Sequence, residues 1–247
     1  MIKIGIIGGS GLDDPKLIRN AKKIKVDTRW GNPSSRLTVG QIGRTEVVIL
    51  ARHGRNHQLS PLQVNNRANI QALKDAGVSH IVATTACGSL REEIHRGDFV
   101  IVDQFIDFTR FRKNTFFDSF EDGIHHAPMA TPFDEKLRSI LSGVSKELNF
   151  GTHDKGTVVT IEGPRFSTVA ESKMFRAWGA DIINMSTAPE TILANEVGIP
   201  YAAIAMSTDY DCWKDDEKPV SWQEVLEVFR KNADHVKQVL LETVPKI

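Results

Sequence analysis

Three short polar clusters follow apolar runs in the sequence and carry groups that can bind an anion. Residues 8–11 (GGSG) offer a hydroxyl and glycines that let the backbone approach a phosphate closely. Residues 52–57 (RHGRNH) offer an arginine fork and histidine donors, and residues 84–89 (TTACGS) offer three hydroxyls. The first cluster lacks both a Walker A lysine and the glycine spacing of a dinucleotide fingerprint. The clusters favour a phosphate site, while a tight glycine turn, a surface Arg/His loop and a small-residue turn stay open.

The spacing of His53 and His57 raises the question of zinc. Two histidines four residues apart can ligate zinc from one face of a helix. No glutamate lies between them, and Gly54 is unfavourable inside a helix. The sequence therefore does not favour a metal site here.

Two carboxylates follow the apolar run at residues 202–207. Asp209 and Asp211 are two residues apart, so they share a face if the strand continues. An apolar setting can raise the pKa of a carboxyl group until it donates a proton near neutral pH. The pair could serve as an acid and its orienting group, bind a metal, or simply be solvated.

Two further strand ends carry side chains that suit a flat ligand. Phe166 follows the run at 156–161 and could stack on a ring or fill the core. Met185 is most simply a core residue, and Ser186 could be a third phosphate donor or a helix-entry residue. Taken together, the strand ends indicate a site for an anion and for a ring that accepts a proton.

Short Val/Ile/Ala-rich runs alternate with helical patterns along the chain, which predicts an α/β fold. Several runs are continuously apolar, as is typical of strands that helices cover on both faces. The predicted strands are residues 2–7, 36–41, 45–51, 79–85, 98–105, 156–161, 181–185 and 200–207.

Capping patterns mark the predicted helix starts. Residues 60–63 (SPLQ) combine a capping box with a proline, and this helix is expected to end at Ala76. Residues 134–149 carry apolar side chains at helical spacing. The Ser/Thr-x-x-Glu signature predicts further starts at Thr168 (with Glu171), Thr187 (with Glu190) and Ser221 (with Glu224).

Residues 106–133 fit neither a helical nor a strand period and are rich in phenylalanine. A long irregular stretch in a compact domain is usually functional or lies at an interface. Exposed phenylalanines would be a liability in a monomer, so we expect this segment to lie at a subunit interface.

Composition narrows the class of protein. The 247 residues carry 31 Lys+Arg and 31 Asp+Glu, and this zero net charge argues against a nucleic-acid-binding protein. The apolar runs are too short to cross a membrane, and the N-terminus lacks a signal-peptide core. Cys87 and Cys212 are the only cysteines, which leaves no disulfide framework. We expect one domain over residues 1–247 in a cytoplasmic protein that binds neither nucleic acid nor membrane.

Long motifs in the same order resemble the 5′-methylthioadenosine phosphorylases of the trimeric purine nucleoside phosphorylase family. They run from Met1 to about Trp213 and read GIIGGSGLDDP, RHGRNH, TTACGSLREEI, GDFVIVDQFIDFT, TIEGPRFST, AESKMFRAWGADIINMS and AMSTDYDCW. The resemblance implies one α/β domain around a twisted mixed β-sheet flanked by helices, in a homotrimer or a dimer of trimers. It implies phosphorolysis of S-methyl-5′-thioadenosine to adenine and 5-methylthioribose 1-phosphate, in methionine and purine salvage, with no metal or organic cofactor.

The resemblance also assigns residues to each part of the substrates. Phosphate would contact Ser10, Arg52, His53, Thr85, Ala86 and Ser186. The nucleoside would contact Phe166, Met185, Thr208, Asp209 and Asp211, and its 5′ group would contact His57, Val225 and Leu226. Asp209 would be the catalytic acid that protonates N7 of the purine. The neighbouring subunit would supply His126, and Ser167 and Trp222 would tune substrate choice.

This chain departs from the family pattern at three positions. Ser10 and Ser186 stand where the eukaryotic enzymes usually have threonine, and the retained hydroxyl is expected to preserve phosphate binding. Trp222 stands in place of a small aliphatic residue, and its indole would narrow or reshape the 5′ pocket.

Asp209 also separates the candidate functions. Its acceptor oxygen suits the 6-amino group of adenine, which disfavours the alternative of a 6-oxopurine nucleoside or methylthioinosine phosphorylase. A nucleosidase would need no phosphate cradle, and the missing glycine fingerprint argues against an NAD-dependent oxidoreductase. A catalytically silent nucleotide-binding trimer is the remaining alternative.

Overall fold

The computed structural model describes residues 2–8, 18–216 and 221–247, with five side chains in the last helix (222, 224 and 229–231) left out. Five α-helices occur in these ranges, namely α1 (Asn66–Asp75), α2 (Glu135–Glu147), α3 (Val169–Ala177), α4 (Thr187–Glu196) and α5 (Trp222–Thr243). Short 3-10 turns cover Pro61–Gln63 and Val244–Lys246.

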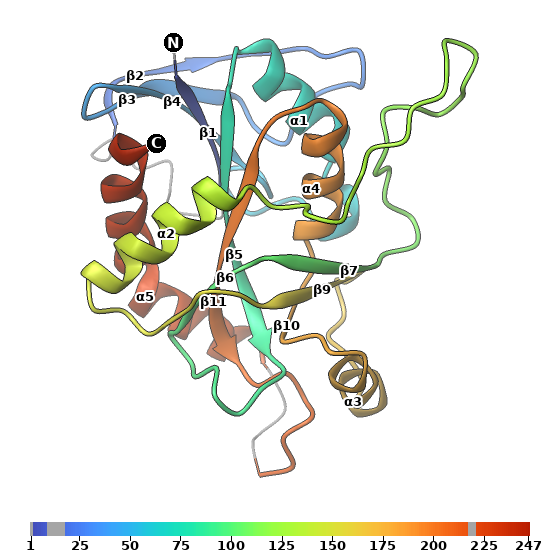
Figure 1. The fold of residues 1–247 in the computed structure, drawn as a ribbon, viewed down its shortest axis with the longest axis vertical. Helices are drawn as coiled ribbons and strands as arrows, with labels where there is room; N and C mark the ends of the chain where they lie inside the picture. Colours follow the sequence, from blue (N-terminus) through green and yellow to red (C-terminus); the bar gives the residue numbers. More distant parts are fainter. Residues whose placement is uncertain (1, 9–17, 217–220) are drawn as a thin grey trace.

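The described strands form one mixed sheet with helices on both sides (Figure 1). They are β1 (Lys3–Gly8), β2 (Arg19–Ile24), β3 (Leu37–Ile42), β4 (Thr45–Ala51), β5 (His80–Ser89), β6 (Phe99–Ile101), β7 (Gln104–Phe108), β8 (Thr152–His153), β9 (Thr157–Ile161), β10 (Ile182–Asn184) and β11 (Tyr201–Asp209). The main path runs β2-β3-β4-β1-β5-β10-β9-β7, and β11 leads from β5 to β6 and β8. The predicted α/β fold with a mixed sheet and flanking helices is confirmed.

The sheet divides at β5. One edge of β5 pairs with β11 from Ile81 to Gly88. The opposite edge pairs with β1 as far as Ala83, and pairing with β10 begins only at Gly88. Within the described residues, 84–87 therefore have a strand neighbour on one edge only, in the middle of the molecule.

Two apolar clusters fix the helices on opposite faces of this sheet. On one face, α1 and α4 contribute side chains such as Leu73 and Leu193. On the other, α2 and α5 contribute side chains such as Leu141 and Val239. Their removal from water supplies the main driving force for folding and holds the strand ends rigidly.

Most predicted strands are confirmed, with two kinds of correction. The predicted strand 98–105 is two strands, because Val102 and Asp103 leave the ladder and Asp103 accepts the backbone N–H of Gly156 at 2.9 Å. Two strands are not predicted from the sequence: β8, which is very short, and β2, whose residues are all exposed and mostly polar. An edge strand without an apolar face gives no alternating pattern to detect.

Two predicted helix starts are wrong. The capping box at Ser60 belongs to a 3-10 turn, and α1 begins later, with Asn65 as its N-cap. In α4 the N-cap is Ser186, and Thr187 is already helical. Glu190 therefore makes no capping box, and its carboxylate is used elsewhere, as described below.

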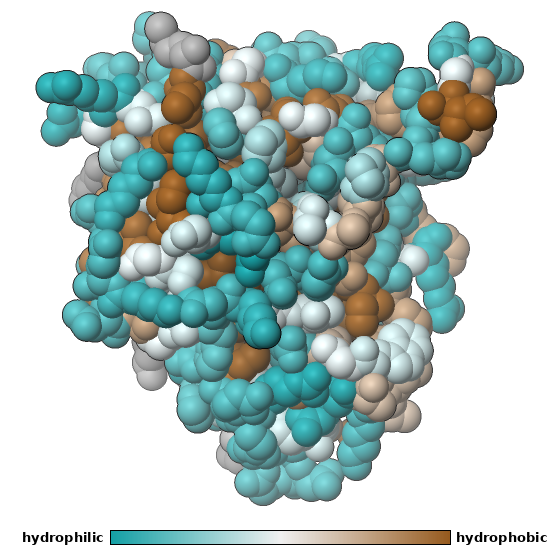
Figure 2. All heavy atoms as spheres, in the orientation of Figure 1, coloured by the Kyte–Doolittle hydropathy of each residue, from teal (hydrophilic) through white to brown (hydrophobic). Residues whose placement is uncertain are grey.

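The predicted irregular segment is partly a strand, since residues 106–108 belong to β7 and pair with β9. Residues 109–133, here called the aromatic segment, contain neither helix nor strand and extend away from the body of the molecule (Figure 1). Phe116 is buried, whereas Phe111 and Ile124 are each 76% exposed. Figure 2 shows hydrophobic side chains on this projection, among hydrophilic neighbours.

Candidate active site

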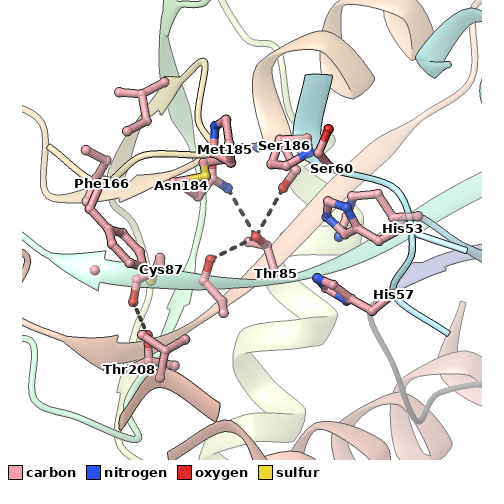
Figure 3. Close-up of a pocket in the computed structure, with 18 of the residues that line it drawn as sticks. His53, His57, Ser60, Thr85, Cys87, Phe166, Asn184, Met185, Ser186 and Thr208 are labelled. Carbon is pink, nitrogen blue, oxygen red and sulfur yellow. Dashed lines mark hydrogen bonds between the residues drawn. The ribbon is translucent and has the colours of Figure 1, made fainter. Parts of the chain in front are cut away.

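A cavity of about 610 Å³ opens along residues 84–87 of β5, which have no second strand neighbour in the part of the chain that the structure describes (Figure 3). Its walls come from β5, from the loops after β4, β9 and β10, from the end of β11 and from α5. The predicted site residues that line it are Arg52, His53, His57, Thr85, Ala86, Phe166, Ser167, Met185, Ser186, Thr208, Asp209, Asp211, Val225 and Leu226. The division of the sheet thus brings the polar strand ends together.

One end of the cavity is a cluster of hydroxyls beside the N-terminus of α4 (Figure 3). Oγ1 of Thr85 lies 3.2 Å from Oγ of Ser186, and Nδ2 of Asn184 donates to Thr85 at 3.3 Å. Ser186 is the N-cap of α4, but its hydroxyl makes no capping bond and faces Thr85 instead. Hydroxyl groups next to the positive end of a helix form an environment that binds anions.

Arg52 lies at the same end and is 3% exposed. Its Nε and Nη2 donate to the carboxylate of Glu190 at 2.5 and 3.0 Å, and its Nη1 donates to the carbonyl oxygen of Thr84 at 2.8 Å. Burial opposes the charge on Arg52, but the Glu190 carboxylate outweighs it and raises the pKa of Arg52. The guanidinium stays charged in a site that is nearly closed to water.

His53 is held as a neutral ring. Burial, reinforced by the positive charge of Arg52, lowers the pKa of His53 to about 4. Nδ1 lies 2.9 Å from the carbonyl oxygen of Leu59, which only accepts, so Nδ1 carries the proton. Nε2 is therefore an acceptor, rather than the donor that the sequence analysis expects. His57 stacks on this ring, with centroids 4.7 Å apart, and burial lowers its pKa as well.

The opposite end of the cavity holds the two carboxylates. Asp209 is 9% exposed, and burial raises its pKa to about 6. Oδ1 of Asp209 accepts the backbone N–H of Asp211 at 2.8 Å, which orients the carboxyl group. Burial also raises the pKa of Asp211.

Thr208 holds the second oxygen of the Asp209 carboxyl group. The Thr208 hydroxyl lies 3.1 Å from the carbonyl oxygen of Cys87 and donates to Oδ2 of Asp209 at 2.7 Å. This hydrogen bond lowers the pKa of Asp209, but burial outweighs it. Asp209 therefore keeps a raised pKa of about 6 and is an acid close to neutral pH.

Between these ends lie Phe166 and Met185, which offer apolar surface (Figure 3). Arg112 of the aromatic segment ties together the loops that carry them. Its Nε donates to the Glu162 carboxylate and its Nη2 to the Glu162 carbonyl, both at 2.6 Å, and Nη2 also reaches the Met185 carbonyl at 3.3 Å. In return, the Glu162 carboxylate accepts the backbone N–H groups of residues 110 and 111.

Three predicted site residues are not among the described residues that line the cavity. Ser10 lies outside the described residues, and Trp222 is the first residue of α5 with a side chain outside the described part. His126 is exposed on the aromatic segment, with its ring 5.3 Å from that of Phe120, and does not line the cavity of its own chain.

The residues that hold the site together are not predicted from the sequence. Asn184, Glu190 and Arg112 bond to site residues. Tyr201 and Glu162 in turn bond to Glu190 and Arg112. Their partners lie far away in the sequence, so no local motif could have found them. Gln58, Ser60 and Gln63 also line the cavity without having been predicted.

No group of three or more His, Cys, Asp or Glu side chains is placed to hold a metal ion within residues 2–8, 18–216 and 221–247. Across the same ranges, none of the helices has the length and apolar character needed to cross a membrane.

This chain is similar to known proteins over its whole length. The family model of the phosphorylase superfamily matches residues 3–245. S-methyl-5′-thioadenosine phosphorylase from Xenopus tropicalis is 55% identical over 250 residues, which cover 100% of this chain and 89% of the relative. The enzyme of the same name from Danio rerio is 52% identical, with the same coverage of both chains.

Solved structures of enzymes with similar names also resemble this chain. Methylthioadenosine phosphorylase from Schistosoma mansoni in complex with adenine superposes with a TM-score of 0.94 at 45% identity, over 99% of this chain and 91% of that one. A mutant adenosine/methylthioadenosine phosphorylase of the same organism in complex with methylthioadenosine gives a TM-score of 0.91 at 45% identity, with the same coverage. The matching family model, the full-length relatives and the similar solved structures show that the chain belongs to the S-methyl-5′-thioadenosine phosphorylase family of the phosphorylase superfamily.

Proposed function

We propose that the chain catalyses phosphorolysis of S-methyl-5′-thioadenosine to adenine and 5-methylthioribose 1-phosphate. One observation carries this proposal: a single cavity holds an anion-binding cluster at one end and a buried, protonatable Asp209 at the other. The curated relatives bear the name of this enzyme, and related structures are complexes with adenine and with methylthioadenosine.

The two ends suit the two partners of the reaction. Phosphate binds at Arg52, His53, Thr85, Ala86 and Ser186, and the nucleoside lies over Met185 with its purine against Phe166 and between Thr208, Asp209 and Asp211. His57, Val225 and Leu226 surround the 5′-methylthio group, and Ser167 and Trp222 tune substrate choice. Ser10 completes the phosphate contacts. Holding a nucleophile and its target in this way can contribute about 7–11 kcal/mol to catalysis.

Asp209 is the catalytic acid. As phosphate attacks C1′, the purine leaves from N9, and a proton or hydrogen bond at N7 makes the purine a better leaving group. A positioned general acid contributes roughly 10²–10⁴ in rate, most effectively when its pKa lies near the working pH. Burial of Asp209 provides this match.

His53 constrains the form of phosphate that the site prefers. Its Nε2 is an acceptor, so a favourable contact requires a hydrogen on the phosphate. A phosphate oxygen that carries a proton donates to Nε2, while unprotonated oxygens accept from Arg52, Thr85 and Ser186.

We further propose one nucleoside phosphorylase domain over residues 1–247, in a cytoplasmic homotrimer or dimer of trimers whose neighbouring subunit supplies His126. The reaction needs phosphate as co-substrate and no metal or organic cofactor. The exposed phenylalanine and isoleucine side chains of the aromatic segment support an interface there.

The test is release of adenine from S-methyl-5′-thioadenosine, followed by liquid chromatography with and without phosphate. Release that requires phosphate is the expected result. Release without phosphate would indicate a hydrolase and contradict the roles of Arg52 and His53. Turnover of inosine or methylthioinosine alone would contradict the role of Asp209.

A further inference from the structure

Behind the hydroxyl cluster lies a buried charged group that the proposed reaction does not yet use. Glu190 has no exposed surface, and its carboxylate accepts from Arg52 at 2.5 and 3.0 Å. The hydroxyl of Tyr201, itself 1% exposed, donates to Oε2 of Glu190 at 2.9 Å. The carboxylate thus accepts three hydrogen bonds from two partners and contacts no solvent.

Four separate elements converge on this group. Arg52 follows β4, Glu190 lies in the first turn of α4, Tyr201 begins β11, and Thr84 in β5 accepts from Nη1 of Arg52 at 2.8 Å. All three guanidinium nitrogens of Arg52 therefore have a protein partner, and these bonds fix the plane and the rotation of the guanidinium.

The contacts to Glu190 and Thr84 do not use every donor of Arg52. A guanidinium has five N–H groups, and these contacts use three of them. Among the described residues, the second N–H of each terminal nitrogen has no other partner, and Arg52 lines the cavity beside Thr85. Guanidinium N–H groups match the oxygens of a phosphate.

Fold stability alone does not explain Glu190. A buried ion pair rarely stabilises a fold more than apolar residues of the same volume do, because both charges lose their hydration. Nor does Glu190 cap α4, whose N-cap is Ser186 without a capping box. The geometry gives its carboxylate one evident task, which is to hold Arg52.

We propose that Glu190, supported by Tyr201, is a positioning residue for the phosphate co-substrate, which it serves by fixing the guanidinium of Arg52. This inference rests on the proposed phosphorolysis. It predicts that disturbing Glu190 weakens phosphate binding and leaves nucleoside binding unchanged, because Met185 and Asp209 are held by other contacts.

A different model makes the opposite prediction. If Glu190 only neutralised Arg52, its removal would free a cation in the cavity and tighten phosphate binding. A purely structural ion pair, in contrast, would change the melting temperature and affect both substrates equally. The sign of the change in phosphate affinity and its restriction to one substrate separate these models.

The experiment uses two variants and one control. Glu190→Gln keeps the shape of the side chain but turns an amide N–H₂ group toward the N–H groups of Arg52, and Tyr201→Phe removes one hydroxyl. Glu147→Gln is the control, because Glu147 lies on α2 and its carboxylate accepts from Lys246 at 2.6 Å, away from the cavity. For each protein we would measure KM for both substrates and the Kd of inorganic phosphate by calorimetry.

For Glu190→Gln we expect the Kd and KM of phosphate to rise at least 10-fold, with the KM of methylthioadenosine within about 2-fold of wild type. Tyr201→Phe should raise the phosphate values 2- to 5-fold, and Glu147→Gln should change the values for neither substrate. Unchanged or tighter phosphate binding, or an equal loss for both substrates, would overturn the inference. If Glu190→Gln does not fold, an unchanged phosphate Kd in folded Tyr201→Phe overturns it equally well.

A double substitution tests whether Glu190 acts through Arg52. The double variant Arg52→Met with Glu190→Gln should bind phosphate no more weakly than Arg52→Met alone, and additive losses would contradict the proposal. Measurements on the wild-type protein distinguish failure of the proposed function from failure of the role proposed for Glu190. If wild-type protein releases adenine without phosphate, the proposed function fails, whereas phosphate-dependent release with unchanged variants defeats only this inference.

Discussion

At the scale of single residues, Asp209 makes the activity depend on pH. Its raised pKa of about 6 means that the acid form is lost as pH rises through that value. Because the acid form protonates the purine, kcat/KM for methylthioadenosine should fall about tenfold for each pH unit above 6. A pH profile from 5 to 9 at saturating phosphate checks this.

The control for that profile is Asp209→Asn, which has no titratable group at the position. Its activity should be roughly 100-fold lower and flat over the same range, apart from the titration of phosphate itself. Its amide can donate to a 6-oxo group, so activity on methylthioinosine relative to methylthioadenosine should rise. An unchanged substrate ratio would contradict the specificity assigned to Asp209.

The sequence reveals residues that act at strand ends and conceals those that act through distant partners. Arg52, Thr85 and Asp209 each follow or end an apolar run, where α/β folds place ligand groups. Glu190 instead looks like part of a helix cap, because it lies three residues after Thr187 in a capping-box pattern. Its actual partner, Arg52, is 138 residues away in the sequence, so the local pattern could not reveal the ion pair.

At the scale of elements, the close packing of β5 against β11 depends on Gly88. A Cβ atom there would lie 2.9 Å from Oδ1 of Asp209 and 3.0 Å from Cγ2 of Ile183. Gly88→Ala should therefore displace the acid and lower kcat/KM roughly 10- to 100-fold, since a shift near 1 Å can cost that much.

The matched control for Gly88→Ala is Gly143→Ala in α2, where a Cβ atom would meet nothing within 4 Å. That variant should keep full activity and gain a little stability, because alanine favours helices. Equal kinetics for the two variants would show that Asp209 tolerates the added methyl group.

The aromatic segment should influence nucleoside binding through Arg112. Arg112→Met removes the bonds to the carbonyl oxygens of Glu162 and Met185 and frees the loops under the nucleoside. We expect KM for methylthioadenosine to rise about 10-fold, and steady-state kinetics would measure it. Arg138→Met is the control, since Arg138 also bonds to backbone carbonyls but lies on α2. Similar kinetics for both variants would contradict this link.

Elements with an apolar signature were predictable, and those without one were not. The continuous apolar runs of β4 and β11 identify them as buried strands. β2 consists of exposed residues and is recognised only through its pairing with β3. The 3-10 turn at Pro61–Gln63 shares its capping box with a true helix start, so the motif alone could not distinguish them.

At the scale of the whole molecule, the aromatic segment predicts self-association. Phe111 and Ile124 are each 76% exposed, which is unfavourable for a free monomer. Sedimentation should show an oligomer, and the double variant Phe111→Ser with Ile124→Ser should shift it toward monomer. If His126 serves a neighbouring site, the monomer should lose most activity. A fully active monomer would contradict that role.

Strand order is the part of the fold that no local pattern contained. β5 pairs with β1, β10 and β11, which come from distant parts of the sequence. Alternating hydrophobicity identifies each strand but carries no information about its neighbours. The family resemblance supplied the mixed sheet, and the position of the cavity followed only from the pairing itself.

The incomplete pairing of β5 has a consequence for amide hydrogen exchange. Residues 84–87 pair with β11 on one edge, and alternate amides along a strand point toward the other edge. These amides should exchange with deuterium faster than those of residues 81–83, although all lie on the same central strand. Phosphate should slow exchange at Ala86, whose N–H group points toward the open edge, because those of Thr85 and Cys87 point toward β11. Exchange at this one amide would then report whether the anion end of the cavity is occupied.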